Sequence, residues 1–87
     1  MFNFFDEIKK KIGNISGDLI NGFNLINISG KVLYVEGHDG ITIISSTMIA
    51  FKIKHGRIVV EGDNLFIKEL TENTILIQGQ IVKVEQF

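Results

Sequence analysis

The stretch GRIVVEGDNLFI, residues Gly56–Ile67, decides how the chain is expected to fold. It joins two short apolar runs through Gly62-Asp63, a pair of residue types that is common in turns. A looser copy lies between Gly30 and Ile43; both copies open with glycine and a basic residue and pass through Val-Glu-Gly. The pattern therefore predicts a β-hairpin that recurs along the chain.

From Phe23 onward, apolar and polar residues alternate with the period of a β-strand. The cluster Gly37–Gly40 is expected to join two paired strands as a tight turn, and Gly79 is expected to bend the last segment, Thr74–Phe87. In the run 49–54, Ile49, Phe51 and Ile53 are expected to face the core, and Ala50, Lys52 and Lys54 the opposite side.

The connections are too short for crossover helices, which favours antiparallel neighbours or a solenoid. We expect a mainly β fold, a small antiparallel meander of about eight short strands that forms a sandwich or roll. A β-solenoid is the alternative, although the glycines do not recur at the fixed period that solenoids require.

Residues 1–14 are expected to form an amphipathic helix ahead of a single β-domain over residues 15–87. Phe5, Ile8 and Ile12 recur at helical spacing, and the acidic residues precede the lysines, as the helix dipole favours. Two interpretations remain open. The helix packs on an open sheet face or on a partner, or Phe2, Phe4 and Phe5 enter a membrane surface while the lysines meet anionic lipid.

Several predicted strands are apolar on both sides, and the run Ile58–Val60 is the clearest example. Such a sheet needs two covers: one can be a second sheet from the same chain, and the other can be the N-terminal helix or another copy of the protein. We therefore expect self-association into a homo-oligomer or binding of a protein partner. The expected interaction surface consists of Phe2, Phe4, Phe5, Ile8, Ile12, Ile58, Val59 and Val60.

Composition excludes several classes of protein. The 87 residues suffice for one domain, and the absence of cysteine rules out disulfides and suits the reducing cytoplasm. The net charge of −1 argues against nucleic acid as a partner. The apolar runs are far shorter than the roughly 20 residues that a membrane-spanning helix needs.

The only concentrated group of chemically active residue types is Glu36-Gly37-His38-Asp39. Glutamate, histidine and aspartate can bind metals or transfer protons, but they are also ordinary turn and strand-end residues. The chain has neither a nucleophile elbow nor a phosphate-binding loop. We therefore expect no catalytic residues, metal or cofactor, and a small metal- or ligand-binding enzyme centred on His38 and Asp39 is the least favoured alternative.

One pattern extends from Ile15 to Phe87. It includes LINISGK (residues 25–31) and VEGHDGI (residues 35–41). It continues with Gly62 and Gly79, each placed between apolar residues that alternate along the chain. This order resembles the YabP/YqfC family of sporulation proteins, in particular its YqfC branch.

The resemblance implies expression in the mother cell of a spore-forming bacterium and a part in spore envelope formation. It implies no catalytic residues. Together with the two-sided apolar strands, it predicts a non-enzymatic scaffold or assembly module in the mother-cell cytoplasm. A peripheral membrane adaptor, held at the forespore membrane by the N-terminal helix, is the alternative.

Overall fold

The computed structural model describes residues 23–87, which form six antiparallel β-strands and no helix. The strands are β1 (Asn24–Ile28), β2 (Val32–Glu36), β3 (Ile41–Ile44), β4 (Met48–Ile53), β5 (Gly56–Leu70) and β6 (Thr74–Gln86). The expected antiparallel, mainly β class is confirmed. The expected helix over residues 1–14 lies outside the described residues.

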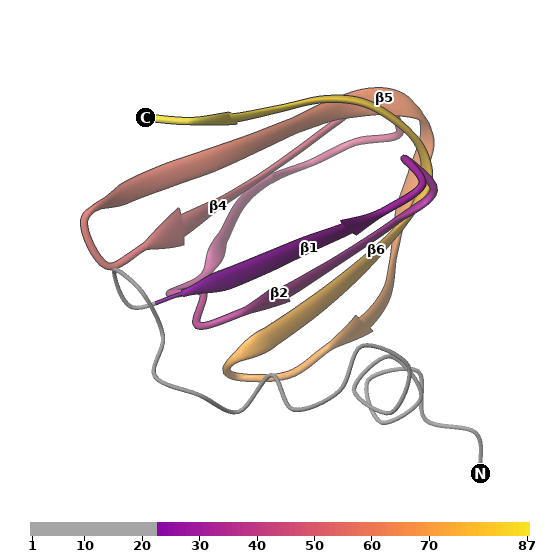
Figure 1. The fold of residues 1–87 in the computed structure, drawn as a ribbon. Coiled ribbons are helices and arrows are strands. Elements are labelled where there is room, and N and C mark those ends of the chain that lie inside the picture. Colours follow the sequence, from indigo (N-terminus) through magenta and orange to yellow (C-terminus); the bar gives the residue numbers. More distant parts are fainter. Residues whose placement is uncertain (1–22) are drawn as a thin grey trace, which may run out of the picture.

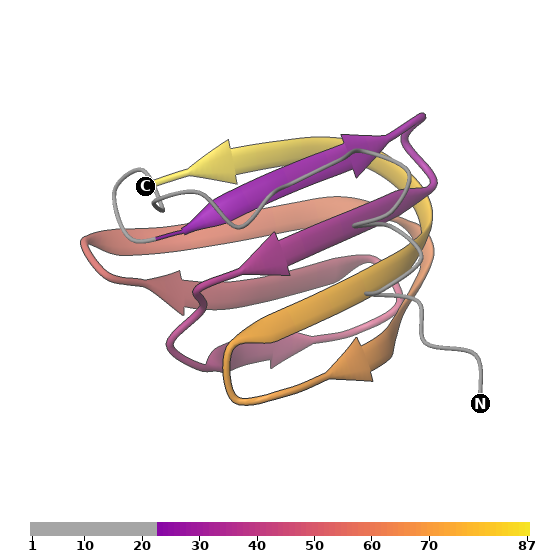
Figure 2. The ribbon, with the colours of Figure 1, turned by 60° about the horizontal axis from the view of Figure 1, so that its bottom comes forward.

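The two longest strands, β5 and β6, bend sharply and fold the sheet over on itself (Figures 1 and 2). β2 pairs with residues 74–78 of β6, whereas β4 pairs with residues 56–61 of β5. One layer, called here the first layer, therefore contains β1, β2, the start of β6 and the end of β5. The second layer contains β3, β4, the start of β5 and the end of β6.

Gly62 does not turn the chain, so the hairpin expected within Gly56–Ile67 is wrong. β5 continues through it as one bent strand, with register shifts between Glu61 and Gly62 and between Asp63 and Phe66. A Cβ at position 62 would collide with the carbonyl oxygen of Gln80. The glycine allows two backbones to approach closely at a bulge, and a turn and a bulge have the same local sequence signature.

Gly79 bends β6 at the same corner, as expected from the sequence. Its φ of 139° suits glycine, and a Cβ there would lie 2.6 Å from the carbonyl oxygen of Asn64. β5 and β6 both continue through this bend, and together they replace four of the short strands expected from the sequence. The fold therefore has six strands and not about eight.

The strand order β1-β2-β6-β5-β4-β3 departs from the expected meander at one point. β2 pairs with β6 and not with β3, so residues 37–40 form a connection between the layers and not a hairpin turn. The long β6 offers β2 a complete partner, which the four-residue β3 cannot do. Because every pair of neighbouring strands is antiparallel, the solenoid alternative is also wrong.

The core lies between the two layers and takes residues from the inner faces of both. It consists of Leu33, Val35, Ile49, Phe51, Ile53, Ile58, Val60, Leu65, Ile75 and Ile77. The alternation predicted for β4 is confirmed, since Ile49, Phe51 and Ile53 all face this core. A second apolar cluster, centred on Tyr34 and Leu76, involves the alternate residues of β2 and β6 and therefore lies on the outer face of the first layer.

Candidate functional site

The outer face of the second layer carries an apolar groove of about 280 Å³, called here the second-layer groove. All four strands of that layer contribute to it. Its lining residues are Thr42, Ile43, Met48, Ala50, Arg57, Val59, Glu61, Glu85 and Phe87.

Strand register explains why these side chains meet. Ala50 is opposite Ile43 on one side and Val59 on the other, and Val59 is in turn opposite Glu85. Because successive residues of a strand point to opposite faces, Val59 faces outward while Ile58 and Val60 face the core. The small side chain of Ala50 leaves room between its larger neighbours, which produces the hollow.

The C-terminal residue forms one wall of the groove. The backbone N–H of Arg57 donates to the carbonyl oxygen of Phe87 at 3.1 Å, and the N–H of Phe87 donates to the carbonyl oxygen of Arg57 at 2.9 Å. The guanidinium carbon of Arg57 lies 5.2 Å from the centre of the Phe87 ring, within the range of a cation–π contact. These contacts hold an aromatic ring beside the groove, although that ring is 58% exposed.

Charged side chains border the groove at the other end. Lys83 donates a hydrogen bond to Glu85 at 2.9 Å, and the pair is solvent-exposed. This bond and the charge of Glu85 raise the pKa of Lys83 above its usual value, and the nearby Glu61 adds to the effect. The groove therefore combines an apolar floor with a charged rim, a common composition for a protein-binding surface.

Beside the groove, β3 forms an edge of the sheet and pairs only with β4 among the described strands. Its Ile43 and Ile44 are 45% and 64% exposed. An edge strand presents backbone N–H and C=O groups that can pair with another strand. The groove and this edge together could accept an extended segment of another protein.

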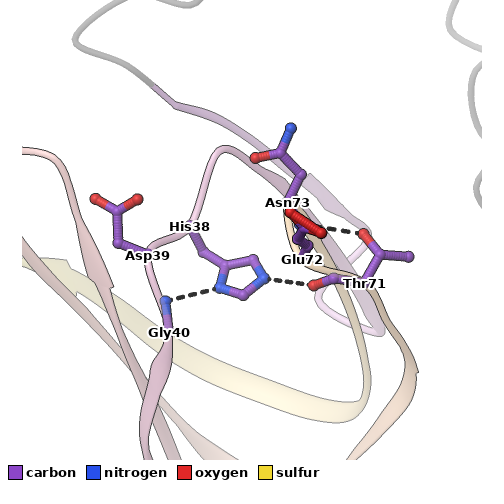
Figure 3. A pocket seen from close by; sticks show the side chains of 6 residues that line it. All are labelled: His38, Asp39, Gly40, Thr71, Glu72 and Asn73. Atoms are coloured by element: carbon purple, nitrogen blue, oxygen red, sulfur yellow. Dashed lines mark hydrogen bonds between the residues drawn. The ribbon is translucent and has the colours of Figure 1, made fainter.

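A second, more open depression of about 760 Å³ surrounds the connection between β2 and β3 (Figure 3). The ring of His38, which is only 6% exposed, lies at its base. Its Nδ1 accepts a hydrogen bond from the N–H of Gly40 at 3.0 Å, and its Nε2 is 2.9 Å from the carbonyl oxygen of Thr71. Because a carbonyl oxygen can only accept and a backbone N–H can only donate, Nε2 is the donor and Nδ1 the acceptor in these two bonds.

Comparison with known proteins identifies the family to which the chain belongs. Residues 22–86 match the profile of the YabP family. The chain belongs to the YabP family. The uncharacterized protein YqfC of Bacillus subtilis (strain 168) is 28% identical over 68 residues, which cover 77% of this chain and 73% of YqfC. No solved structure matches. The family resemblance is therefore confirmed, and it indicates a sporulation-related protein.

In this YabP-family chain, the predicted interaction residues fall into three groups. Ile58 and Val60 are 2% and 0% exposed, so they stabilise the core and do not form a surface. Val59 lies in the second-layer groove. The other five residues lie outside the part of the chain that the structure describes: Phe2, Phe4, Phe5, Ile8 and Ile12. The sequence pattern did not show that one face of the run Ile58–Val60 covers the domain's own core.

His38 is a structural residue in this YabP-family fold. Both ring nitrogens form hydrogen bonds to backbone groups, so a metal ion could bind either nitrogen only if one of these bonds broke. Among residues 23–87, no group of three or more histidine, cysteine, aspartate or glutamate residues is arranged to hold a metal ion. The sequence could not reveal the bond to Thr71, because 33 positions separate the two residues.

Proposed function

We propose that this YabP-family protein is a non-enzymatic assembly module in spore envelope formation, acting by self-association or by binding a protein partner. The contact surface consists of the second-layer groove and the edge of β3, which pairs only with β4 among the strands of residues 23–87. Family membership supports the connection with sporulation. The observation that carries the proposal is the apolar floor of Ala50 and Val59, next to the exposed side chain of Ile43.

The energetics favour a protein as the occupant of this surface. Covering apolar surface contributes roughly 25 cal/mol per Å², so burial of the exposed side chains of Ile43 and Phe87 would stabilise a complex by several kcal/mol. The edge of β3 would supply directional backbone hydrogen bonds. Arg57, Glu61 and Glu85 at the rim would select the partner by charge.

The test combines a groove variant with a matched control. Ile43→Lys places a charge in the groove at a side chain that is already half exposed, and Phe66→Lys makes the same change at a 49% exposed residue of the first layer. Self-association is measured by light scattering after size exclusion over a wide range of concentrations. Partner-dependent function is measured as spore yield in cells that carry each variant.

We expect Ile43→Lys to lower the molar mass in solution, the spore yield, or both, while Phe66→Lys leaves both near the wild-type values. A wild-type protein that is monomeric at every concentration would contradict self-association. If the folded Ile43→Lys variant also supported a normal spore yield, the groove would have no part in assembly and the proposal would fail.

The peripheral membrane adaptor remains the alternative function. It depends on residues 1–12, which lie outside the described residues. Within residues 23–87, the structure contains no helix of the length and apolarity needed to span a bilayer. Liposome flotation of the full chain tests the adaptor, since an adaptor should float with anionic vesicles and lose that ability when Phe4 and Phe5 are replaced by serine.

A further inference from the structure

The outer face of the first layer has an apolar centre. Tyr34 of β2 is opposite Ile26 of β1 on one side and Leu76 of β6 on the other, so the three side chains form a row across the layer. Ile28 and Val32 extend the cluster along β1 and β2. The side chains of Leu33, Val35, Ile75 and Ile77 alternate with this row and point to the core on the opposite face.

Tyr34 and Leu76 are both 0% exposed, although they point away from the core between the layers. Side chains stand roughly perpendicular to a sheet, and neighbours in the same sheet shield only their flanks. Full burial of a side chain as large as tyrosine therefore requires a cover above the sheet. Layered folds achieve this by packing a helix or another sheet on the apolar face.

The chain has a segment that fits this position. Residues 1–22 precede Phe23 and β1, a strand of the first layer whose Ile26 and Ile28 belong to the cluster. Phe5, Ile8 and Ile12 would form one apolar stripe if residues 1–14 were helical. Such a helix would be about 21 Å long, which exceeds the width of roughly 10 Å that three neighbouring strands occupy.

Charge supports the same arrangement. Glu69 of β5 is opposite Leu76 in the strand register and thus borders the apolar row. Its Oε2 atom is buried and has no hydrogen-bond partner among the described residues. A buried carboxylate oxygen is costly without a donor. Lys9 and Lys11, which would lie on the two sides of the apolar stripe in such a helix, are suitable donors.

We propose that the N-terminal segment docks on the outer face of the first layer of its own chain, with Phe5, Ile8 and Ile12 against Tyr34 and Leu76. The domain then has three layers. The first layer is covered from within the chain, and the second-layer groove stays available to another protein. This docking is independent of the proposed assembly function, because it concerns the opposite face of the fold.

The fluorescence of Tyr34 reports on this docking without a label, because the chain contains one tyrosine and no tryptophan. The test compares acrylamide quenching of tyrosine fluorescence in the full chain, in an Ile8→Gln/Ile12→Gln variant and in a Lys10→Gln control from the opposite helical face. We expect quenching to rise severalfold, toward that of free tyrosine, in the double variant alone. Equal quenching in all three proteins, with circular dichroism showing an intact sheet, would overturn the proposal.

Two further measurements identify the cover. The first measurement follows tyrosine quenching of the wild type, which should not change on dilution or on addition of anionic vesicles. If dilution increased the quenching, a second copy of the chain would be the cover. If the tyrosine were protected from quenching only when vesicles were present, lipid would be the cover.

The second measurement uses engineered cysteine pairs, which report proximity without background because the chain has no cysteine of its own. We expect an intramolecular disulfide for Ile12→Cys with Val32→Cys but not for Ile12→Cys with Ile43→Cys. The reverse pattern would overturn the proposal even if the glutamine variant failed to fold.

Discussion

The side chain of His38 donates a hydrogen bond to the carbonyl oxygen of Thr71 at 2.9 Å and thereby joins the connection between the two layers to the turn between β5 and β6. The backbone N–H of Gly37 reinforces this junction by donating to the carbonyl oxygen of Asn73 at 2.6 Å. The histidine thus stabilises the point at which the strand order departs from a meander.

Replacing His38 by alanine should destabilise the fold by about 1–3 kcal/mol, because it leaves the N–H of Gly40 and the carbonyl of Thr71 without their partner. The free energy of unfolding in urea measures this loss. His55→Ala, at an exposed turn residue, is the matched control and should change stability by no more than about 0.5 kcal/mol. Equal losses in the two variants would show that the His38 bonds contribute nothing.

Gly62→Ala should destabilise the protein by about 1–3 kcal/mol or more, because the added methyl group would collide with the carbonyl oxygen of Gln80. The cause is steric overlap between two backbones, so shifting a flexible side chain cannot relieve it. Thermal unfolding measures the effect. The neighbouring exposed Asp63→Ala should change stability by less than about 0.5 kcal/mol, and a Gly62→Ala variant as stable as that control would refute the close approach.

The contact between Arg57 and Phe87 should contribute about 0.5–1 kcal/mol, as expected for a cation–π pair at an exposed site. A double-mutant cycle with Arg57→Ala and Phe87→Ala isolates this coupling from the loss of each side chain. Urea denaturation of the four proteins provides the free energies. Strictly additive losses would show that the ring and the guanidinium do not interact.

The Lys83–Glu85 pair should produce a small dependence of stability on pH at the alkaline end. The pKa of Lys83 is raised in the folded protein, so the stabilisation is complete below the usual lysine value of 10.5 and is lost as the pH rises through the folded value. The stability difference between wild type and Glu85→Gln should therefore shrink above pH 10.5. A difference that stays constant through this range would contradict the pairing.

The sequence predicted the parts of the fold that depend on local pattern. The alternation of Ile49, Phe51 and Ile53 predicted a strand with one core face, and Gly79 predicted a bend, because both signals lie within a few residues. The turn assigned to Gly62 was wrong, since the strand continues through a bulge that depends on the distant Gln80. Local sequence does not contain that contact.

The candidate site was predictable only in part, for a similar reason. Two-sided apolarity in β5 indicated a second covered face, but it could not show that Val59 lines a groove while Ile58 and Val60 fill the core. That distinction depends on the pairing of β5 with β4 and β6. Likewise, the role of His38 requires the crossing of the chain between layers, which no short motif specifies.

The pairing of β2 with β6 has a consequence for the synthesis of the chain. β2 ends at Glu36, but the residues of β6 that pair with it, Thr74–Gln78, come much later in the chain. β2 therefore gains its second neighbour only after β3, β4 and β5 have been synthesised, and such non-local pairing is slow to form. We expect β1 and β2 to remain without this pairing in nascent chains that end before Thr74.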